Sequence, residues 1–258
     1  MTSANEIASV SPNRNLADQK YWNEAHEDFI FAVERNTPVF QFIERHCDRG
    51  PGDILEIGCF PGRFLPAFGG LGFRLNGVDL NRRTARELPE WLRTMGCEVG
   101  EFQVADFDRL EAEPKYDIVA SFGFVEHFED WRAVILRQAA FCRPGGQLIV
   151  TAPNFDCTVQ RVMHRLFDND SYRCHVLEAM NPGQWARLLK ANGFEIEFSG
   201  FFGPYGFSLH QERGFMRQTI QLLGLALNKL ILRPVLTRLP EGASSYAGFC
   251  GVVARKAG

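Results

Sequence analysis

Short apolar runs alternate with helical patterns over residues 52–152, and this alternation restricts the fold more than any other feature of the sequence. The first run, residues 53–58, lies between Gly-Pro-Gly and a closing glycine, as is typical of a buried parallel strand. Further runs predict strands over 73–79, 99–105, 116–122 and 147–152, with helices from about 62, over 82–95 and over 131–142. Strands that alternate with helices require right-handed crossovers, so we expect a parallel sheet covered on both faces.

The sequence after Pro153 follows a looser pattern that still adds to the sheet. The rhythm weakens as far as Tyr172, and then predicts a helix over 182–191 and a strand over 194–199. A long helical stretch over 212–236 precedes a last apolar strand over 248–254. We therefore predict an α/β fold with a doubly wound, mostly parallel sheet of seven strands, an antiparallel last strand and a helical cap insertion.

Four segments follow from this order of elements. Residues 1–48 form a polar leader and a helical cap, whose helical pattern opens at Tyr21 and Trp22 and is kinked or divided by Pro38. Residues 49–200 form the ligand-binding core, residues 201–245 an aromatic loop and a helical lid insertion, and residues 246–258 the final strand.

Composition excludes several classes of protein. Hydrophobic residues make up 45% and charged residues 23% of the chain, which rules out a disordered or collagen-like protein. A net charge of -3 gives no field that would concentrate a nucleic acid. The seven cysteines never form C-x-x-C, which argues against a disulfide framework or a zinc ribbon. The start of the chain lacks an apolar signal region and no run reaches 18 apolar residues, so we predict a cytoplasmic protein.

Polar and glycine residues follow three of the predicted strands at the edge where such sheets bind ligands. Gly58 and Gly62 permit a sharp turn and a close approach of the backbone to a ligand. Asp79 ends the second strand 21 residues after Gly58, at the spacing of a carboxylate that accepts ribose hydroxyls. Asp106 and Phe107 would add an acceptor and an aromatic face after the third strand. Together they predict a nucleotide-sized site.

Two other nucleotide sites fit the sequence less well. A dinucleotide-dependent oxidoreductase would need G-x-G-x-x-G, but Phe60 stands where the second glycine belongs. The phosphate-binding pattern G-x-x-x-x-G-K-[ST] is absent from the sequence.

The chain resembles the class I S-adenosylmethionine-dependent methyltransferases, a family with a Rossmann-like core. The resemblance covers about residues 52–154 and a later helix and strand at 184–194. The matching segments, in chain order, are ILEIGCFPGRF at 54–64, GVDL at 77–80, VADF at 104–107, YDIVASF at 116–122, VEHF at 125–128 and RPGGQLIV at 143–150.

The resemblance implies a role for each matching position. The turn from Gly58 to Gly62 would shape the methionine side of the S-adenosylmethionine site, and Asp79 would bind the ribose hydroxyls. Leu80 and Phe107 would flank the adenine, and Asp106 would accept from its exocyclic amine. The full cofactor-binding set is Glu56, Gly58, Cys59, Phe60, Gly62, Asp79, Leu80, Asp106, Phe107, Phe122 and Gly123, with the last two on the methyl-transfer side.

The predicted catalytic residues are His127 and Glu126, just beyond the fourth strand. A sulfonium activates its own methyl group, so the protein mainly aligns the acceptor, and His127 would act as the base for a hydroxyl. The alternative is that either residue only caps a helix or braces the loop. The pair also resembles that of metal-assisted methyltransferases, but Gly123 stands three positions before Glu126, so the ligand set is incomplete and we predict no metal.

Substrate contacts are predicted at Tyr21, Trp22, His175, Phe202 and Tyr205. For the apolar stretch over 212–236 three interpretations compete: a substrate cap, which we favour, a homodimer surface, and a helix lying in the plane of a membrane.

The sequence therefore predicts methyl transfer from S-adenosylmethionine to an oxygen or nitrogen of a small, partly apolar molecule in biosynthesis, with S-adenosylhomocysteine as product. Two alternatives stay open: a catalytically silent, partner-binding subunit, and a metal-assisted O-methyltransferase.

Overall fold

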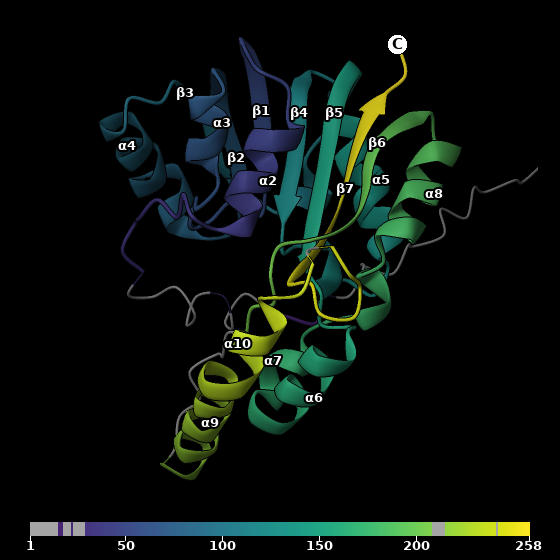
Figure 1. Ribbon diagram of the computed structural model, residues 1–258. Coiled ribbons are helices and arrows are strands. Elements are labelled where there is room, and N and C mark those ends of the chain that lie inside the picture. Colours follow the sequence, from purple (N-terminus) through teal and green to yellow (C-terminus); the bar gives the residue numbers. More distant parts are fainter. Residues whose placement is uncertain (1–14, 18–21, 23–28, 208–214, 241) are drawn as a thin grey trace, which may run out of the picture.

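The computed structural model describes residues 15–17, 22, 29–207, 215–240 and 242–258, and its centre is one seven-stranded sheet (Figure 1). The strands lie in the order β3-β2-β1-β4-β5-β7-β6. They are β1 (Gly52–Ile57), β2 (Phe73–Asp79), β3 (Val99–Val104), β4 (Tyr116–Phe122), β5 (Cys142–Pro153), β6 (Phe194–Phe202) and β7 (Phe249–Lys256). β1 to β5 pair in parallel, whereas β7 inserts antiparallel between β5 and β6. The predicted fold is confirmed.

Helices cover both faces of this sheet and its lower edge. The α-helices are α2 (Pro38–His46), α3 (Leu65–Gly70), α4 (Glu87–Thr94), α5 (Trp131–Phe141), α6 (Thr158–Phe167), α7 (Asn169–Arg173), α8 (Pro182–Ala191), α9 (Phe215–Leu227) and α10 (Arg233–Leu236). Short turns are η1 (Arg82–Ala85), η2 (Phe107–Arg109), η3 (Val125–His127) and η4 (Leu177–Ala179), and η5 (Asn228–Leu232) is a π-helical turn between α9 and α10.

The core lies in two layers because neighbouring residues of each strand point to opposite faces. Ile54 and Ile118 belong to the layer under α2, α3 and α4. Their neighbours Leu55 and Val119 belong to the layer under α5 and α8. Both faces of the central strands are thus buried, which explains why these strands read as continuous apolar runs.

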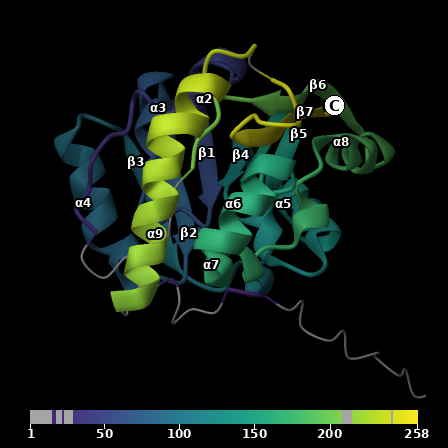
Figure 2. The same cartoon turned by 60° about the horizontal axis from the view of Figure 1, so that its bottom comes forward.

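The parallel register brings the carboxyl ends of β1, β2 and β4 to one edge. Glu56 pairs with Gly77 of β2 and with Ala120 of β4, so the loops after these three strands begin side by side. β1 is also the point at which the chain order reverses, and ligands bind to such sheets there. α6, α7, α9 and α10 lie beyond the same edge (Figure 1), and α9 lies beside α6 (Figure 2).

Several helix boundaries differ from the expectation. The pattern opening at Trp22 does not continue as a helix to His46, because α2 begins at Pro38, where the Thr37 hydroxyl caps the Phe40 N–H. Residues 29–36 are instead irregular. The helix expected over 82–95 is divided into η1 and α4, since Asn81 caps a separate 3-10 turn. α6 was not predicted, because Gln160 and His164 on its buried side obscure the apolar periodicity.

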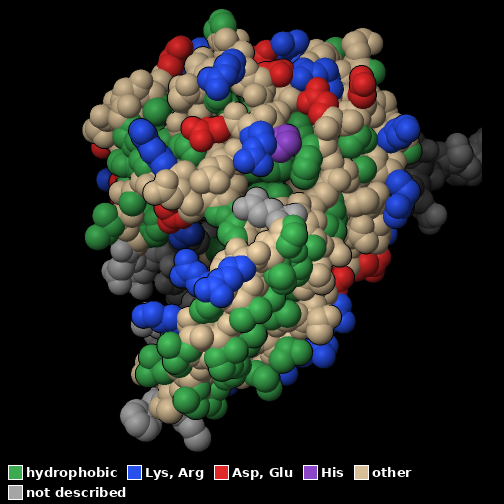
Figure 3. All heavy atoms as spheres, in the orientation of Figure 1, with side chains coloured by type: hydrophobic (Ala, Val, Ile, Leu, Met, Phe, Trp, Pro, Cys, Tyr) green, Lys and Arg blue, Asp and Glu red, His purple; other side chains and the backbone are tan. Residues whose placement is uncertain are grey.

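A helical stretch is present at residues 215–236, as predicted. The expectation that no segment is long and apolar enough to span a membrane was wrong. Residues Arg217–Leu236 are long and apolar enough to cross a bilayer by length and composition, with a mean hydropathy of 1.3 and only 17% of that window buried. The expectation rested on runs of consecutive apolar residues, whereas in this segment polar residues lie between the apolar ones. Figure 3 shows apolar side chains gathered over this projecting helix. Exposed apolar residues of this segment include Leu222, Leu223, Leu230 and Ile231.

All seven cysteines are free thiols in the structure.

We expect the buried central strand to carry much more stability than the projecting helix. Ile118→Ala, at a side chain that is 1% exposed, should lower the free energy of unfolding by about 2–5 kcal/mol because it leaves a cavity. The matched control Ile231→Ala, at 57% exposure, should change it by less than about 0.5 kcal/mol. Urea unfolding followed by circular dichroism measures both, and equal losses would contradict the assignment of the core.

Candidate functional site

A cavity of about 550 Å³ opens at the carboxyl ends of β1, β2, β3 and β4. Every residue predicted to bind a cofactor lines it: Glu56, Gly58, Cys59, Phe60, Gly62, Asp79, Leu80, Asp106, Phe107, Phe122 and Gly123. The sequence did not predict Asn15, Phe124 and Phe128, which line it as well. Asn15 forms a bridge with Phe128, so part of the expected leader folds back onto the site. One site therefore unites segments from the start of the chain to β4.

The turn after β1 needs glycine at both ends. Gly58 has φ +70°, and a Cβ there would lie 2.5 Å from the Phe124 ring. Gly62 has φ +81°, and a Cβ would lie 2.3 Å from Leu88 Cδ1. Phe60, between them, lies edge-on to the Phe31 ring, 5.9 Å away between centroids. The Arg83 guanidinium lies 5.4 Å from the centroid of the same Phe60 ring. The large side chain is therefore held by its own packing contacts on the cavity wall.

The Asp79 carboxylate is fixed by backbone donors at the end of β2. Its Oδ2 accepts from the Phe60 N–H at 3.1 Å and its Oδ1 from the Asn81 N–H at 2.7 Å. Burial raises the pKa of Asp79, and these backbone hydrogen bonds act in the opposite direction. Each oxygen has a further lone pair, so a carboxylate held in this way can accept two neighbouring hydroxyls.

Glu56 presents a buried carboxyl group at the same wall. It is 3% exposed, and its Oε2 has no hydrogen-bond partner among the described residues. Burial raises the pKa of Glu56 well above its usual range, and the nearby charge of Asp79 raises it further. A buried acceptor without a partner is suited to an ammonium or another donor of a ligand.

Leu80 and Phe107, here called the apolar slot, line the cavity together with Asp79. Leu80 is 46% exposed although it lines the cavity, and Phe107 lies buried at the start of η2. Asp106, at the edge of the slot, accepts from the Asp108 N–H at 3.1 Å. An exposed leucine, an aromatic ring and an edge carboxylate are the groups that a flat heteroaromatic ring with an amine would contact.

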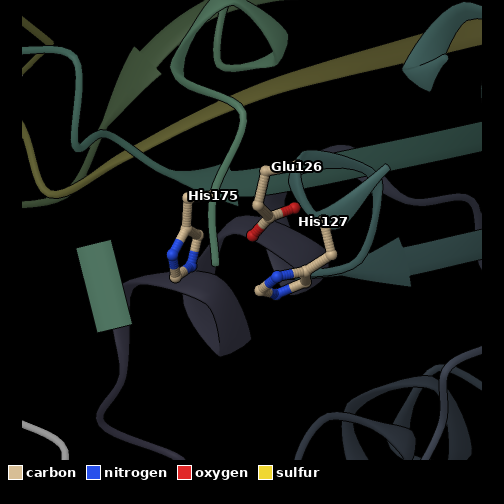
Figure 4. Close-up of side chains that lie close together, drawn as sticks. All are labelled: Glu126, His127 and His175. Atoms are coloured by element: carbon tan, nitrogen blue, oxygen red, sulfur yellow. The ribbon is translucent and has the colours of Figure 1, made fainter. Parts of the chain in front are cut away.

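Three further side chains meet beside the cavity (Figure 4). Glu126 and His127 lie in η3, and His175 comes from the segment between α7 and η4. One potential ligand atom from each lies within 4.8 Å of the other two. Burial raises the pKa of Glu126 to about 8. Of the three, His127 lines the cavity. The sequence predicted each residue in the site but not that His175 joins the other two.

The remaining predicted substrate contacts fall in different places. Trp22 lines the cavity, with its ring edge-on to His127 at 5.0 Å. Tyr21 lies outside the described residues. Phe202 stacks on Phe42 at 4.2 Å and Tyr205 is buried, and neither lines the cavity. Phe202, at the end of β6, thus packs against α2 and not on the cavity wall.

Comparison with known families gives a match over most of the chain. The profile of the methyltransferase-domain family matches residues 31–197. The ubiquinone biosynthesis O-methyltransferase of Stutzerimonas stutzeri is 25% identical over 134 residues, which cover 52% of this chain and 58% of that protein. A probable S-adenosylmethionine-dependent methyltransferase of Mycolicibacterium smegmatis is 24% identical over 182 residues, 70% of this chain and 62% of that one. The chain thus matches less than two thirds of the length of either relative.

Solved structures share the fold at low sequence identity. A putative methyltransferase from Bacillus halodurans C-125 has a TM-score of 0.56 at 15% identity, covering 84% of this chain and 98% of that one. The [4+2]-cyclase SpnF has a TM-score of 0.51 at 16% identity, covering 85% and 80%. These likenesses concern the fold alone, because proteins with this architecture differ in their chemistry.

The buried carboxyl of Glu56 should make stability depend on pH. Its folded pKa lies above the unfolded value, so the stability it contributes is complete at low pH and is lost as the pH rises through the folded pKa. The difference in free energy of unfolding between Glu56→Gln and the unmodified protein should therefore shift in favour of the variant between pH 5 and pH 8. Urea unfolding of both proteins at each pH measures this shift. An equal difference at both pH values would show that Glu56 is not held protonated by burial.

Proposed function

Because the chain belongs to the methyltransferase-domain family, we propose that it transfers a methyl group from S-adenosylmethionine to an oxygen of a small, partly apolar molecule. S-adenosylhomocysteine is then the second product. The observation that carries the proposal is the convergence of Glu56, Asp79 and the slot of Leu80 and Phe107 on one cavity. Their chemistry matches the ammonium, the ribose diol and the adenine of one ligand.

Each of these residues would bind a different part of the cosubstrate in the cavity. Asp79 accepts from the two ribose hydroxyls, and Leu80 and Phe107 contact the faces of the adenine. The buried Glu56 carboxyl, whose Oε2 lacks a protein donor, receives the ammonium of the methionine end. The turn from Gly58 to Gly62 allows the backbone to approach that end closely.

The transfer itself needs alignment more than added reactivity. The bound sulfonium supplies an activated methyl group: the acceptor oxygen forms its bond to the methyl carbon while the S–CH3 bond breaks and its electron pair stays on sulfur. Phe122 and Gly123 line the side of the cavity from which the acceptor approaches. His127 also lines the cavity, and together with Glu126 it accepts the proton that the acceptor hydroxyl loses.

The wall around this position favours an apolar acceptor. Trp22, Phe124 and Phe128 line the cavity together with His127. Aromatic walls exclude water and bind flat or apolar molecules. The likeness to relatives named as O-methyltransferases favours oxygen over nitrogen as the methylated atom. A nucleic-acid substrate is not proposed, since the net charge of -3 offers no general attraction for phosphates.

The projecting helix lies outside the cavity. α9 packs on α6, where Gly224 allows the Phe167 ring to approach, and none of the described residues of 215–236 lines the cavity. We therefore propose it as an outer flank of the site in a cytoplasmic enzyme. Its exposed leucines would also suit a homodimer contact or a peripheral membrane contact.

Asp79→Asn should weaken the binding of S-adenosylhomocysteine at least about tenfold, because hydrogen bonds to a charged acceptor are replaced by weaker ones. Asp48→Asn is the matched control, since Asp48 pairs with Arg255 outside the cavity and should leave binding unchanged. Isothermal titration calorimetry measures both affinities. Equal affinities for all three proteins would contradict the assignment of Asp79.

The activity is tested by incubating the protein with S-adenosylmethionine and fractionated metabolite extracts. A product heavier than its acceptor by one CH2 group, formed together with S-adenosylhomocysteine, is expected. S-adenosylhomocysteine binding without any product, together with stable co-purification of another protein, would favour the catalytically silent subunit. Absence of binding would overturn the proposed function.

A further inference from the structure

Glu126, His127 and His175 together supply one carboxylate and two imidazoles within 4.8 Å of one another (Figure 4). We propose that these three side chains bind one divalent first-row transition-metal ion, which in turn holds the acceptor oxygen for methylation. The inference rests on the proposed function and specifies how the acceptor is activated. Two nitrogen donors favour such an ion over Mg²⁺ or Ca²⁺, which prefer oxygen ligands.

The Glu126 carboxyl group is the first observation in favour of a cation. It is 0% exposed, and neither Oε1 nor Oε2 has a hydrogen-bond partner among the described residues. An ionised carboxylate in this position would be costly without a positive charge nearby. Protonation would remove the charge but would leave a buried O–H donor and a carbonyl oxygen, both still without partners. A bound metal ion satisfies the group in its ionised form.

The orientation of His127 is the second observation. Its Nδ1 lies 2.8 Å from the carbonyl oxygen of Cys174. A carbonyl oxygen only accepts hydrogen bonds, so in the neutral ring Nδ1 carries the proton and Nε2 carries the lone pair. Metal-binding histidines are oriented in this way, with the second ring nitrogen donating to a carbonyl or a carboxylate.

His175 is positioned by its two neighbours in the chain. The Cys174 carbonyl oxygen bonds to the His127 ring, and the Val176 N–H donates to the Glu126 carbonyl oxygen at 2.7 Å. The residues on both sides of His175 are therefore bound to the two other members of the group. The His175 ring lies 4.6 Å from that of His127 and 4.8 Å from that of Phe155, between centroids. The backbone thus brings the third donor to the group before any ion binds.

Three protein ligands leave coordination positions for an acceptor. His127 lines the cavity, and Gly123 next to it has no side chain. A Cβ on Gly123 would lie 3.6 Å from Glu126 Oε1, so the carboxyl group lies close to this part of the cavity wall. With His127 and Glu126 bound to the ion, neither takes the acceptor proton: the ion would instead lower the pKa of a bound acceptor hydroxyl, whose proton passes to water. The resulting oxygen anion attacks the methyl group, the S–CH3 electron pair stays on sulfur, and the charge of the ion does not change.

The test measures metal binding directly, on tag-free protein treated with a chelator and then desalted. Titration with Zn²⁺ should show about one ion per chain, and Co²⁺ should give the visible absorption of a bound ion. Glu126→Gln and His175→Asn should each weaken Zn²⁺ binding at least about tenfold. His46→Asn is the matched control, because His46 packs on Phe42 and Phe198 away from the group and should bind Zn²⁺ as the unmodified protein does. Circular dichroism checks that each variant folds. If Glu126→Gln does not fold, the test relies on His175→Asn, because the His175 side chain is only half-buried.

The outcomes separate this inference from the proposed function. Titration with S-adenosylhomocysteine should still show binding without Zn²⁺, because Asp79, Leu80 and Phe107, which would hold its adenosine, are not among the three metal ligands. The metal site would be overturned if the protein bound no Zn²⁺ at this group and methyl transfer continued at an unchanged rate after chelation. The proposed methyltransferase activity would then still hold. Stoichiometric Zn²⁺ binding that both variants lose would support the metal site. If the same protein bound no S-adenosylhomocysteine, the proposed function would be overturned. Zn²⁺ binding that survives in both folded variants also overturns the site.

Discussion

The parallel pairing of β1 with β2 on one side and β4 on the other is the constraint on which the site depends. Because Glu56 aligns with Gly77 and with Ala120, the three strands end at the same height, and their loops open into one cavity. A displaced register would separate Asp79 from Glu56 and from η3. The apolar side chains of both core layers, such as Ile54 and Leu55 on neighbouring positions, hold this register in place.

Two carboxyl groups at the site are held without full hydrogen bonding. Glu56 and Glu126 are both buried, and each has at least one oxygen without a partner among the described residues. Such groups cost stability in the free protein, and they are found where a ligand supplies the missing partner. In our account an ammonium meets Glu56 and a metal ion meets Glu126, so the same burial that destabilises the free chain strengthens both interactions when the ligands bind.

The residues that line the cavity after β1, β2 and β3 were predictable from the sequence because their signals are local. Gly58 directly follows β1, Asp79 ends β2 and Phe107 lies three residues after the end of β3, and parallel strands bring such positions together at one edge of the sheet. The acceptor half was less predictable. Phe202 and Tyr205 were predicted to contact the substrate, but clustered aromatic residues are typical of protein cores as well as of pocket walls. The group around His127 depends on a hydrogen bond to Cys174, 47 residues away, which no periodicity reveals.

The helices outside the core show the same limit. α6 was missed because Gln160 and His164 face the interior, and an amphipathic pattern depends on apolar residues there. The start of α2 at Pro38 followed from capping by Thr37, which overrode the apolar spacing between Trp22 and His46. A polar cap thus set the start of α2, whereas buried polar residues concealed α6.

The decisive experiment is a crystal structure of the protein with S-adenosylhomocysteine bound. We expect the ribose hydroxyls on the Asp79 carboxylate, the adenine between Leu80 and Phe107, and the sulfur atom facing Gly123 and His127. Density for the ligand outside this cavity, or an Asp79 carboxylate turned away from the ribose, would contradict it.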